Sequence, residues 1–286
     1  MVCKARNCNG ERLSLIFEMG KSLPATNTTP TYDADGNLLN DGRFNDAWDA
    51  EQYDRIGSIL DEGEAGARRV KLLRIRKLNQ NRLTRLQPTA GALAGGHPHL
   101  ILEFAYDYQS RRIRKQVIDA ANGNAILSDR RFLYDGWNLV AEFEATPSNQ
   151  LDPVAYHFWG NDLSGTEQGA GGVGGLFMSR IKRPDNQAWE IYHPTYDGNG
   201  NIIAWVDGTG SVIQRLDYDA FGNTLTRQGT FPGGIKMNFG FSTKYEDSES
   251  GLLYYGYRYY DPVTGRWPSR DPIGERWNQP LRDGRE

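Results

Sequence analysis

The sequence has few cysteines, no excess of charge of either sign and no long hydrophobic run. Its 286 residues include two cysteines, Cys3 and Cys8, too few to define the fold by disulfides or to predict a zinc site. The net charge of −3 gives no overall bias toward nucleic acid or an anionic membrane. No apolar run approaches the length that spans a bilayer, and residues 13–17 are too short for the apolar region of a signal peptide. The residues therefore predict no membrane span and no nucleic-acid partner, and they leave the localisation unknown.

Glycine, tyrosine and tryptophan are abundant instead. The chain has 33 glycines, 15 tyrosines and seven tryptophans. Glycine supplies the positive φ that tight turns need, and aromatic side chains pack well on pleated sheet faces. Long helices would require more alanine, leucine and glutamate. The composition therefore predicts an all-β protein of many short strands.

A Tyr-Asp dipeptide recurs, followed by a Gly/Asn turn and an apolar strand. Four copies are clear and two keep only the dipeptide: Tyr32-Asp33, Tyr134-Asp135, Tyr196-Asp197 and Tyr218-Asp219, then Tyr106-Asp107 and Tyr260-Asp261. In each unit the tyrosine should end a strand, and the aspartate should hydrogen-bond the backbone amides ahead of it as an Asx turn. Strands with a period near 2 are expected at 188–192, 202–207 and 212–217. Because one hairpin cannot bury its own face, the copies are predicted to stack into a curved, β-solenoid-like ribbon.

Two patterns suggest ligand sites, but each has a simpler explanation. Gly169, Gly171 and Gly174 spell G-x-G-x-x-G, yet a polar loop precedes them and the stretch that follows is too short for a helix. We therefore predict a glycine-rich bend. The turns after Asp33 and Asp197 lack the glycine and glutamate spacing of a calcium loop. No cofactor, no cofactor-binding residue and no metal ligand is predicted.

The stretch from 61 to 99 is the least regular part of the chain. Eight lysines and arginines lie between residues 68 and 86. Leu72, Ile75 and Leu78 would line one stripe of a possible short basic helix near 68–86. The other interpretation, which we favour, is a divergent strand pair with a solvated charged face.

The C-terminal residues 239–275 closely resemble the RHS repeat-associated core. The matching motifs are a Gly-Leu-Tyr-Tyr strand at 251–255, RYYDP at 258–262, GRW at 265–267 and a DPIG motif within 269–274. With the upstream repeats, the resemblance covers most of residues 30–60 and 100–275 and indicates an RHS/YD-repeat protein of the polymorphic-toxin shell family. It implies a β-sheet ribbon wound into a hollow shell around a C-terminal toxin, with the core as an internal plug. In many family members this plug is a self-cleaving aspartyl protease; others are secreted or lie at cell surfaces and bind carbohydrate.

The same segment supplies the candidate catalytic residues. Asp261 and Asp271 are ten residues apart in a strand–turn–strand stretch, so their carboxylates could converge and share a proton. Arg258 or Arg270 could keep one of them ionised. Alternatively, Asp-Pro at both positions simply opens turns. The family continues to a second DPxGL motif, around which cleavage occurs, and then to the toxin; this chain is expected to lack both, as a truncated member.

These observations divide the chain into six parts. They are an unassigned segment 1–29, a YD repeat 30–60, a divergent charged segment 61–99, YD repeats with a glycine-rich insert 100–238, the core motif 239–275 and a divergent tail 276–286. We expect a structural, encapsulating module whose partners are other RHS/YD-repeat shell segments or a toxin cargo. A remnant aspartyl autoprotease is the one enzymatic activity considered. The alternative is a cell-surface protein that mediates adhesion or binds carbohydrate. Carbohydrate would bind through exposed tryptophans, with the candidates Trp137, Trp159, Trp189 and Trp205.

Overall fold

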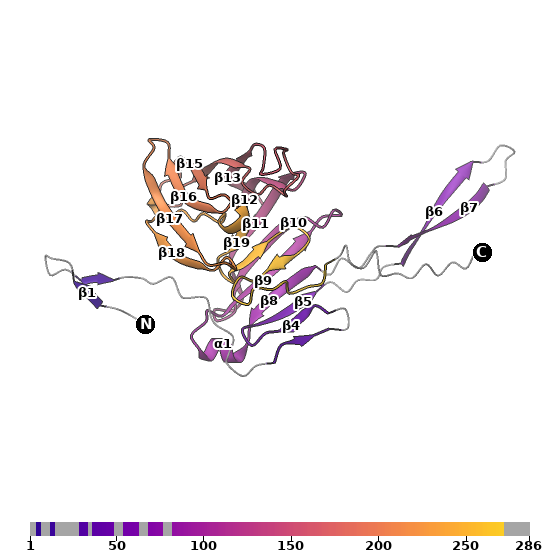
Figure 1. Cartoon of the computed structure of the whole chain (residues 1–286). Coiled ribbons are helices and arrows are strands. Elements are labelled where there is room, and N and C mark those ends of the chain that lie inside the picture. The colour runs from indigo at the N-terminus through magenta and orange to yellow at the C-terminus, as the bar shows by residue number, and fades with distance from the viewer. Residues whose placement is uncertain are drawn as a thin grey trace.

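The chain folds around one large antiparallel sheet (Figure 1). The computed structural model describes the backbone of residues 4–6, 12–14, 29–33, 36–48, 54–62, 68–76 and 82–271, and the side chains of 29–33, 36–48 and 82–271. The sheet has 14 strands in the order β18-β17-β16-β15-β14-β13-β12-β11-β10-β9-β8-β5-β4-β3. Neighbours in the sheet are thus neighbours in sequence, except where β8 follows β5. The predicted all-β ribbon of stacked hairpins is confirmed.

The strands are short and the helices few in the described residues. The sheet consists of β3 (Thr31–Tyr32), β4 (Leu38–Asn40), β5 (Phe44–Trp48), β8 (Leu83–Pro88), β9 (Leu100–Tyr106), β10 (Arg112–Asp119), β11 (Ala125–Asp135), β12 (Asn138–Ala145), β13 (Leu151–Trp159), β14 (Leu176–Lys182), β15 (Trp189–Tyr196), β16 (Ile202–Asp207), β17 (Val212–Tyr218) and β18 (Thr224–Gln228). A second sheet holds β19 (Tyr245–Asp247), β20 (Leu252–Tyr254) and β21 (Tyr259–Tyr260). Two hairpins pair β1 (Lys4–Arg6) with β2 (Arg12–Ser14) and β6 (Asp54–Glu62) with β7 (Arg68–Arg76). One α-helix, α1 (Ala90–Ala94), and two 3-10 turns, Pro232–Gly234 and Phe241–Thr243, complete the elements.

The charged segment forms strands, so the possible helix near 68–86 is wrong. The strand β7 pairs in antiparallel register with β6, from Asp54 opposite Arg76 to Glu62 opposite Arg68. This register sets acidic positions opposite basic ones, which favours pairing of the two strands over a separate helix. The strand pair that we favoured is the arrangement found.

The aspartate of the repeat forms the predicted Asx turn. Asp197 Oδ1 accepts hydrogen bonds from the amides of Asn199 and Asn201, both at 2.9 Å, and its Oδ2 accepts from Asn201 Nδ2 at 2.7 Å. The same bonds join Asp219 to Asn223 and, in part, Asp33 to Asn37. These turns therefore have one local construction.

The tyrosine of the repeat makes a second contact, which we did not predict from the sequence. We call β3, β5, β9, β11, β13, β15 and β17 entering strands, and β4, β8, β10, β12, β14, β16 and β18 return strands. The aromatic residue that ends an entering strand donates to the backbone carbonyl near the start of the preceding return strand. The bonds are Trp48 Nε1 to Leu38 (2.6 Å), Tyr106 Oη to Leu83 (2.6 Å), Tyr134 Oη to Arg112 (2.9 Å), Trp159 Nε1 to Leu139 (2.7 Å), Tyr196 Oη to Leu176 (2.5 Å) and Tyr218 Oη to Ile202 (2.9 Å). Each hairpin is thus tied to the one before it.

The hydrophobic core lies between one face of the large sheet and the C-terminal segment. Its buried side chains come from nearly every sheet strand and also from this segment, including Phe239, Tyr245 and Tyr259. The C-terminal strands, yellow in Figure 1, accordingly lie against the large sheet. Within the described residues, no helix is both long and apolar enough to cross a bilayer.

Candidate functional site: the core segment on the rim of the sheet

Each turn that leads from an entering strand to the next return strand lies at the same end of the large sheet. Consecutive strands of an antiparallel sheet run in opposite directions, so every second turn lies at this end. We call the six such turns after β3, β9, β11, β13, β15 and β17 the rim turns. All five dipeptides from Tyr32-Asp33 to Tyr218-Asp219 open a rim turn.

Residues 239–271, which we call the core segment, contact the hairpins of all six rim turns. The Pro268 carbonyl accepts from Leu38 N (2.8 Å), and Tyr254 Oη accepts from Arg112 N (2.8 Å). Tyr257 packs at a tilt on Trp137, with 4.4 Å between the ring centroids. Thr243 Oγ1 accepts from Gly174 N (2.8 Å) and donates to the Gly200 carbonyl (2.7 Å), and the Pro262 carbonyl accepts from Asn223 Nδ2 (2.7 Å). The core segment therefore spans the rim from β4 to β18.

Thr243 joins two of these turns under strain. The residue is 2% exposed and has a φ of 54°, a conformation that β-branched residues rarely adopt. Such a backbone costs on the order of 1–3 kcal/mol and persists where its surroundings fix it. Here the two hydrogen bonds of its hydroxyl, to Gly174 and Gly200, provide that constraint.

A buried arginine fixes the small sheet of the core segment to the large one. Arg112 Nη1 lies 2.5 Å from Asp247 Oδ2, and the two side chains are 1% and 0% exposed. Lys115 Nζ bonds the other oxygen of Asp247 at 3.0 Å. Burial opposes the charge of Asp247, but Arg112 and Lys115 hold its pKa below the ordinary value. Five rings surround the guanidinium at 4.6–5.8 Å: Phe104, Phe132, Tyr245, Tyr254 and Tyr259.

Glu142, His157 and Ser179 are arranged like a hydrolase triad, but they are sealed inside the molecule. His157 Nδ1 lies 2.9 Å from Ser179 Oγ, and its Nε2 lies 3.0 Å from Glu142 Oε1. Ser179 is 0% exposed and sits on a strand paired on both sides, so no neighbouring amide is available as an oxyanion donor. Phe239 covers the imidazole edge-on at 4.9 Å, and Tyr245 donates to Glu142 at 3.1 Å. The group therefore joins the core segment to the sheet and has no route for a substrate.

The structure brings two of the predicted site residues together. Arg258 Nη2 lies 2.9 Å from Asp271 Oδ2, and the Asp271 side chain is 48% exposed. The same guanidinium stacks on Trp267 at 4.1 Å. The Asp271 side of this pair faces solvent, whereas the Arg258 side chain is mostly covered, and the pair lies where the described chain ends.

Asp261 has different partners and is buried. Its Oδ2 accepts from Arg43 Nη2 and from Thr264 Oγ1, the latter at 2.8 Å, and its Oδ1 accepts from Val263 N at 3.0 Å. Arg43 also contacts Asp41 at 2.5 Å. Asp261 therefore forms both a turn and a buried ion pair with the start of the sheet.

Arg270 packs against the first rim turn. Its guanidinium lies against Gly36, at the place where a Cβ would be. Gly36 has a φ of 81°, and this backbone conformation favours glycine at the position.

The buried ion pair that Asp261 forms with Arg43, beside Asp41, was not predicted from the sequence. Arg43 pairs with a residue 218 positions away. The only indication in the sequence was an arginine between apolar strands.

The glycine-rich insert encloses a carboxylate of the chain itself. Asp162 Oδ2 accepts from the amides of Ala170 (2.7 Å) and Gly172 (3.0 Å), and its Oδ1 accepts from Ser164. Burial opposes the charge, but these bonds lower the pKa of Asp162 to about 2. The amides that a phosphate would need are thus occupied, and the predicted bend is confirmed.

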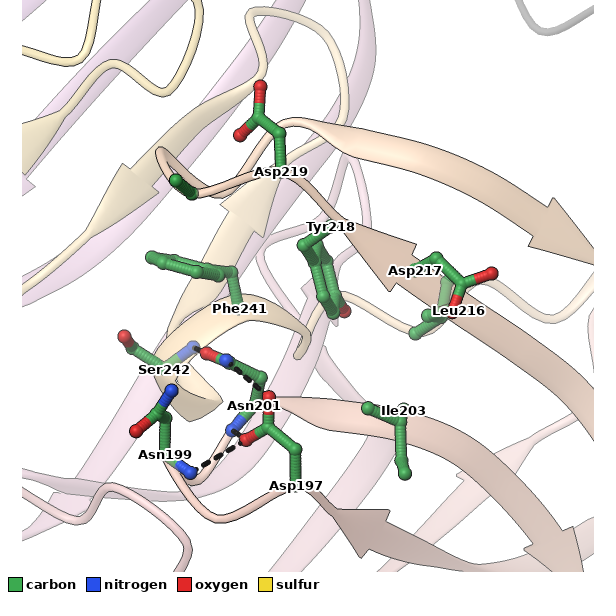
Figure 2. A pocket seen from close by; sticks show the side chains of 11 residues that line it. Asp197, Asn199, Asn201, Ile203, Leu216, Asp217, Tyr218, Asp219, Phe241 and Ser242 are labelled. Carbon is green, nitrogen blue, oxygen red and sulfur yellow. Dashed lines mark hydrogen bonds between the residues drawn. The ribbon is translucent and has the colours of Figure 1, made fainter.

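A pocket of about 500 Å³ lies between the last two rim turns and the core segment (Figure 2). The rings of Tyr218 and Phe241 meet there edge to face, with 5.7 Å between their centroids. Asp197 and Asp219 also line it, but their oxygens are engaged in the Asx turns. None of the four predicted catalytic residues lines the pocket.

The tryptophans considered for sugar binding are not free platforms. Trp205 is 0% exposed, so its predicted exposure is wrong; it packs beneath Phe231 in the core. Trp137, Trp159 and Trp189 are partly buried. In the described part of the chain, no group of three potential metal ligands occurs.

The fold and the site define a class of protein: an antiparallel sheet of stacked YD-repeat hairpins whose rim turns are bound by the C-terminal segment of the same chain. Comparisons with known proteins agree. The family described as the Teneurin YD-shell matches residues 182–282. By these likenesses the chain is an RHS/YD-repeat protein.

Three proteins similar to this chain are much longer than it is. The tRNA3(Ser)-specific nuclease WapA of Bacillus spizizenii is 27% identical over 274 residues, which are 95% of this chain and 9% of the relative. The toxin subunit YenC1 of Yersinia entomophaga is 29% identical over 241 residues, 78% of this chain and 22% of that protein. The fold resembles the crystal structure of TcdB2-TccC3, with a TM-score of 0.56, 18% identity, and coverage of 85% of this chain and 10% of that one. The chain therefore spans less than a quarter of each of these proteins.

Proposed function

We propose that the chain is an encapsulating module in which the YD-repeat sheet is part of a shell wall and the core segment closes one end of that wall. The observation that carries this proposal is that one segment binds the hairpins of all six described rim turns. A plug needs such contacts because it must close a whole end of the sheet. Two relatives are named as a nuclease and a toxin subunit, so we infer a toxin polypeptide as the cargo.

A protease-protection assay tests the proposal. An unstructured reporter peptide with one protease site is fused after Glu286 in one protein and before Met1 in another. Enclosure behind the plug predicts slower cleavage of the C-terminal reporter. The Arg112→Met change should abolish this difference by loosening the core segment. Equal cleavage rates at the two positions would contradict an encapsulating role.

We further propose that the core segment is related to the self-cleaving aspartyl protease of the family. The described residues do not by themselves form an active protease. An aspartic dyad needs two carboxylates on one water. Asp261 is committed to Arg43, whereas Asp271, beside Arg258, is open to solvent. Of the four candidates, Asp271 and Arg258 are therefore the better placed to take part in a reaction. Asp261 and Arg270 stabilise the fold.

Intact mass measured over several days at a series of pH values tests this second part. We expect the mass to stay at 32.2 kDa. A discrete clip that disappears in Asp271→Asn but persists in Asp217→Asn, a change at an exposed aspartate outside the core segment, would instead assign Asp271 a catalytic role.

A further inference from the structure

Two turns of the large sheet carry the same tripeptide, Asn-Gly-Asn. One is Asn122-Gly123-Asn124, in the turn from β10 to β11, and the other is Asn199-Gly200-Asn201, in the rim turn after β15. The residue before the tripeptide is small in both turns, Ala121 in the first and Gly198 in the second. The two sites are therefore a matched pair, and a difference in reactivity between them has to come from the fold.

An Asn-Gly pair loses ammonia without an enzyme when its backbone is free to turn. The glycine nitrogen attacks Cγ of the asparagine side chain, the bond from Cγ to Nδ2 breaks, and ammonia leaves with the proton of the glycine amide. Water then opens the succinimide ring to aspartate or isoaspartate, so that one water is consumed and one ammonia is released. Glycine favours the attack because it has no Cβ to hinder its nitrogen. The reaction also requires that the glycine amide is not engaged in a hydrogen bond.

The turn from β10 to β11 meets both requirements. Residues 121–127 are exposed, and no described atom beyond the chain neighbours of Gly123 lies within 4 Å of the place where its Cβ would be. The Gly123 amide donates no hydrogen bond within the described residues. The Asn122 side chain is held by one hydrogen bond, from its Nδ2 to Asp119 Oδ2 at 2.5 Å, and this bond is exposed to solvent. Such a bond restrains the side chain little, because water competes for both groups.

The rim turn after β15 meets neither requirement, because the turn itself and the core segment both hold its glycine. The Gly200 amide donates to the Asp197 carbonyl at 3.2 Å, and the Gly200 carbonyl accepts from the buried hydroxyl of Thr243 at 2.7 Å. The next residue is bound as well, since Asn201 Oδ1 accepts from the amide of Ser242 at 2.8 Å (Figure 2). The backbone of this turn is therefore fixed on the side that would have to rotate.

We propose that Asn122 is a site of spontaneous deamidation and that the core segment protects the matched Asn199 from the same reaction. The nucleophile is the Gly123 nitrogen, the reacting carbon is Asn122 Cγ, and water is the co-reactant. The product carries one more negative charge, which lies beside the Asp119 carboxylate. The hydrogen bond between these two side chains is thereby replaced by a repulsion between like charges, which loosens the turn.

Peptide mapping by mass spectrometry tests the proposal on the whole chain. One sample stays folded and another is unfolded in guanidinium chloride, until half of the Asn199 peptide in the unfolded sample has gained about 1 Da, the change from amide to acid. In the unfolded sample both sites should convert at similar rates, because their sequence neighbours match. In the folded sample Asn122 should convert at a rate close to its unfolded one. Asn199 should convert at least about ten-fold more slowly, because two hydrogen bonds of Gly200 have to open first.

The change Thr243→Ala separates protection by the core segment from protection by the turn. It removes the hydroxyl that binds the Gly200 carbonyl and leaves the hydrogen bonds of Asp197 in place. Conversion of Asn199 in the folded variant should become about five-fold faster, the effect of one hydrogen bond, while that of Asn122 stays the same. Thr243→Ser keeps the hydroxyl and is the matched control. The wild-type comparison does not depend on either variant.

Three results would overturn the proposal. If Asn122 stays unchanged in the folded protein while it converts in guanidinium chloride, its turn holds it in an unreactive geometry. If Asn199 converts as fast as Asn122 in the folded protein, the fold does not protect it. If a folded Thr243→Ala variant converts Asn199 no faster than the wild type, the protection comes from the turn and not from the core segment.

Discussion

The Tyr-Asp dipeptide combines a local contact with a distant one. Asp197 shapes its own turn through bonds to residues two and four positions ahead. Tyr196, its neighbour, donates instead to Leu176, 20 positions back on another hairpin. The aspartate bonds could be predicted because their partners are close in sequence. The tyrosine bond could not, because its acceptor is a backbone atom whose position depends on how the hairpins stack.

We predict that Tyr196→Phe destabilises the protein by about 1–3 kcal/mol, because the buried carbonyl of Leu176 then loses its donor. Urea unfolding, followed by tyrosine and tryptophan fluorescence, measures the difference. Tyr108→Phe is the control: that side chain is 83% exposed and should unfold as the wild type does. Equal unfolding midpoints for both variants would show that the contact contributes little.

At the scale of elements, acidic residues of the core segment dock on basic residues of the large sheet. Asp247 meets Arg112 and Lys115, and Asp261 meets Arg43, all of them buried. A buried ion pair adds little net stability, but removing one partner is costly, so such pairs fix where an element docks. These pairings could not be predicted, because sequence patterns report periodicity and turns but not the partner of a buried charge.

Glu142 makes the docking of the core segment sensitive to acid. Burial alone would raise the pKa of Glu142, but the hydrogen bonds from His157 and Tyr245 and the charge of Arg130 lower it to about 2. Because the pKa is lower in the folded state, the stabilisation of about 3 kcal/mol is present above pH 5 and disappears as the pH falls toward 2. Asp247, whose pKa is also lowered, acts in the same direction.

The prediction is that the free energy of unfolding falls between pH 5 and pH 2 and that Glu142→Gln reduces this slope. Urea titrations at several pH values measure both slopes. Asp152→Asn, at an exposed aspartate of β13, is the control and should keep the wild-type slope. A Glu142→Gln slope as steep as that of the wild type would assign the acid sensitivity to other groups.

At the scale of the whole molecule, repeats and resemblance predicted the architecture well. The turn chemistry recurs often enough to imply a stacked ribbon, and the RYYDP and DPIG motifs marked the core segment. The boundaries of the six proposed parts stay a prediction. The contact of the core segment with both ends of the sheet, through Arg43 and Asn223, could not be foreseen. It depends on how far the ribbon curves, which strand patterns do not specify.

The last prediction concerns this long-range closure. Arg43→Gln should leave Asp261 buried without its cation, at a cost of about 3–5 kcal/mol. Hydrogen exchange should then rise in β4 and β5 and also in residues 259–266, because the ion pair joins them. Arg85→Gln breaks a half-exposed pair with Glu103 and should cost less than about 1 kcal/mol, with little change in exchange. Faster exchange confined to β4 and β5 would mean that the core segment holds its place without Arg43, and that the two ends of the sheet are independent.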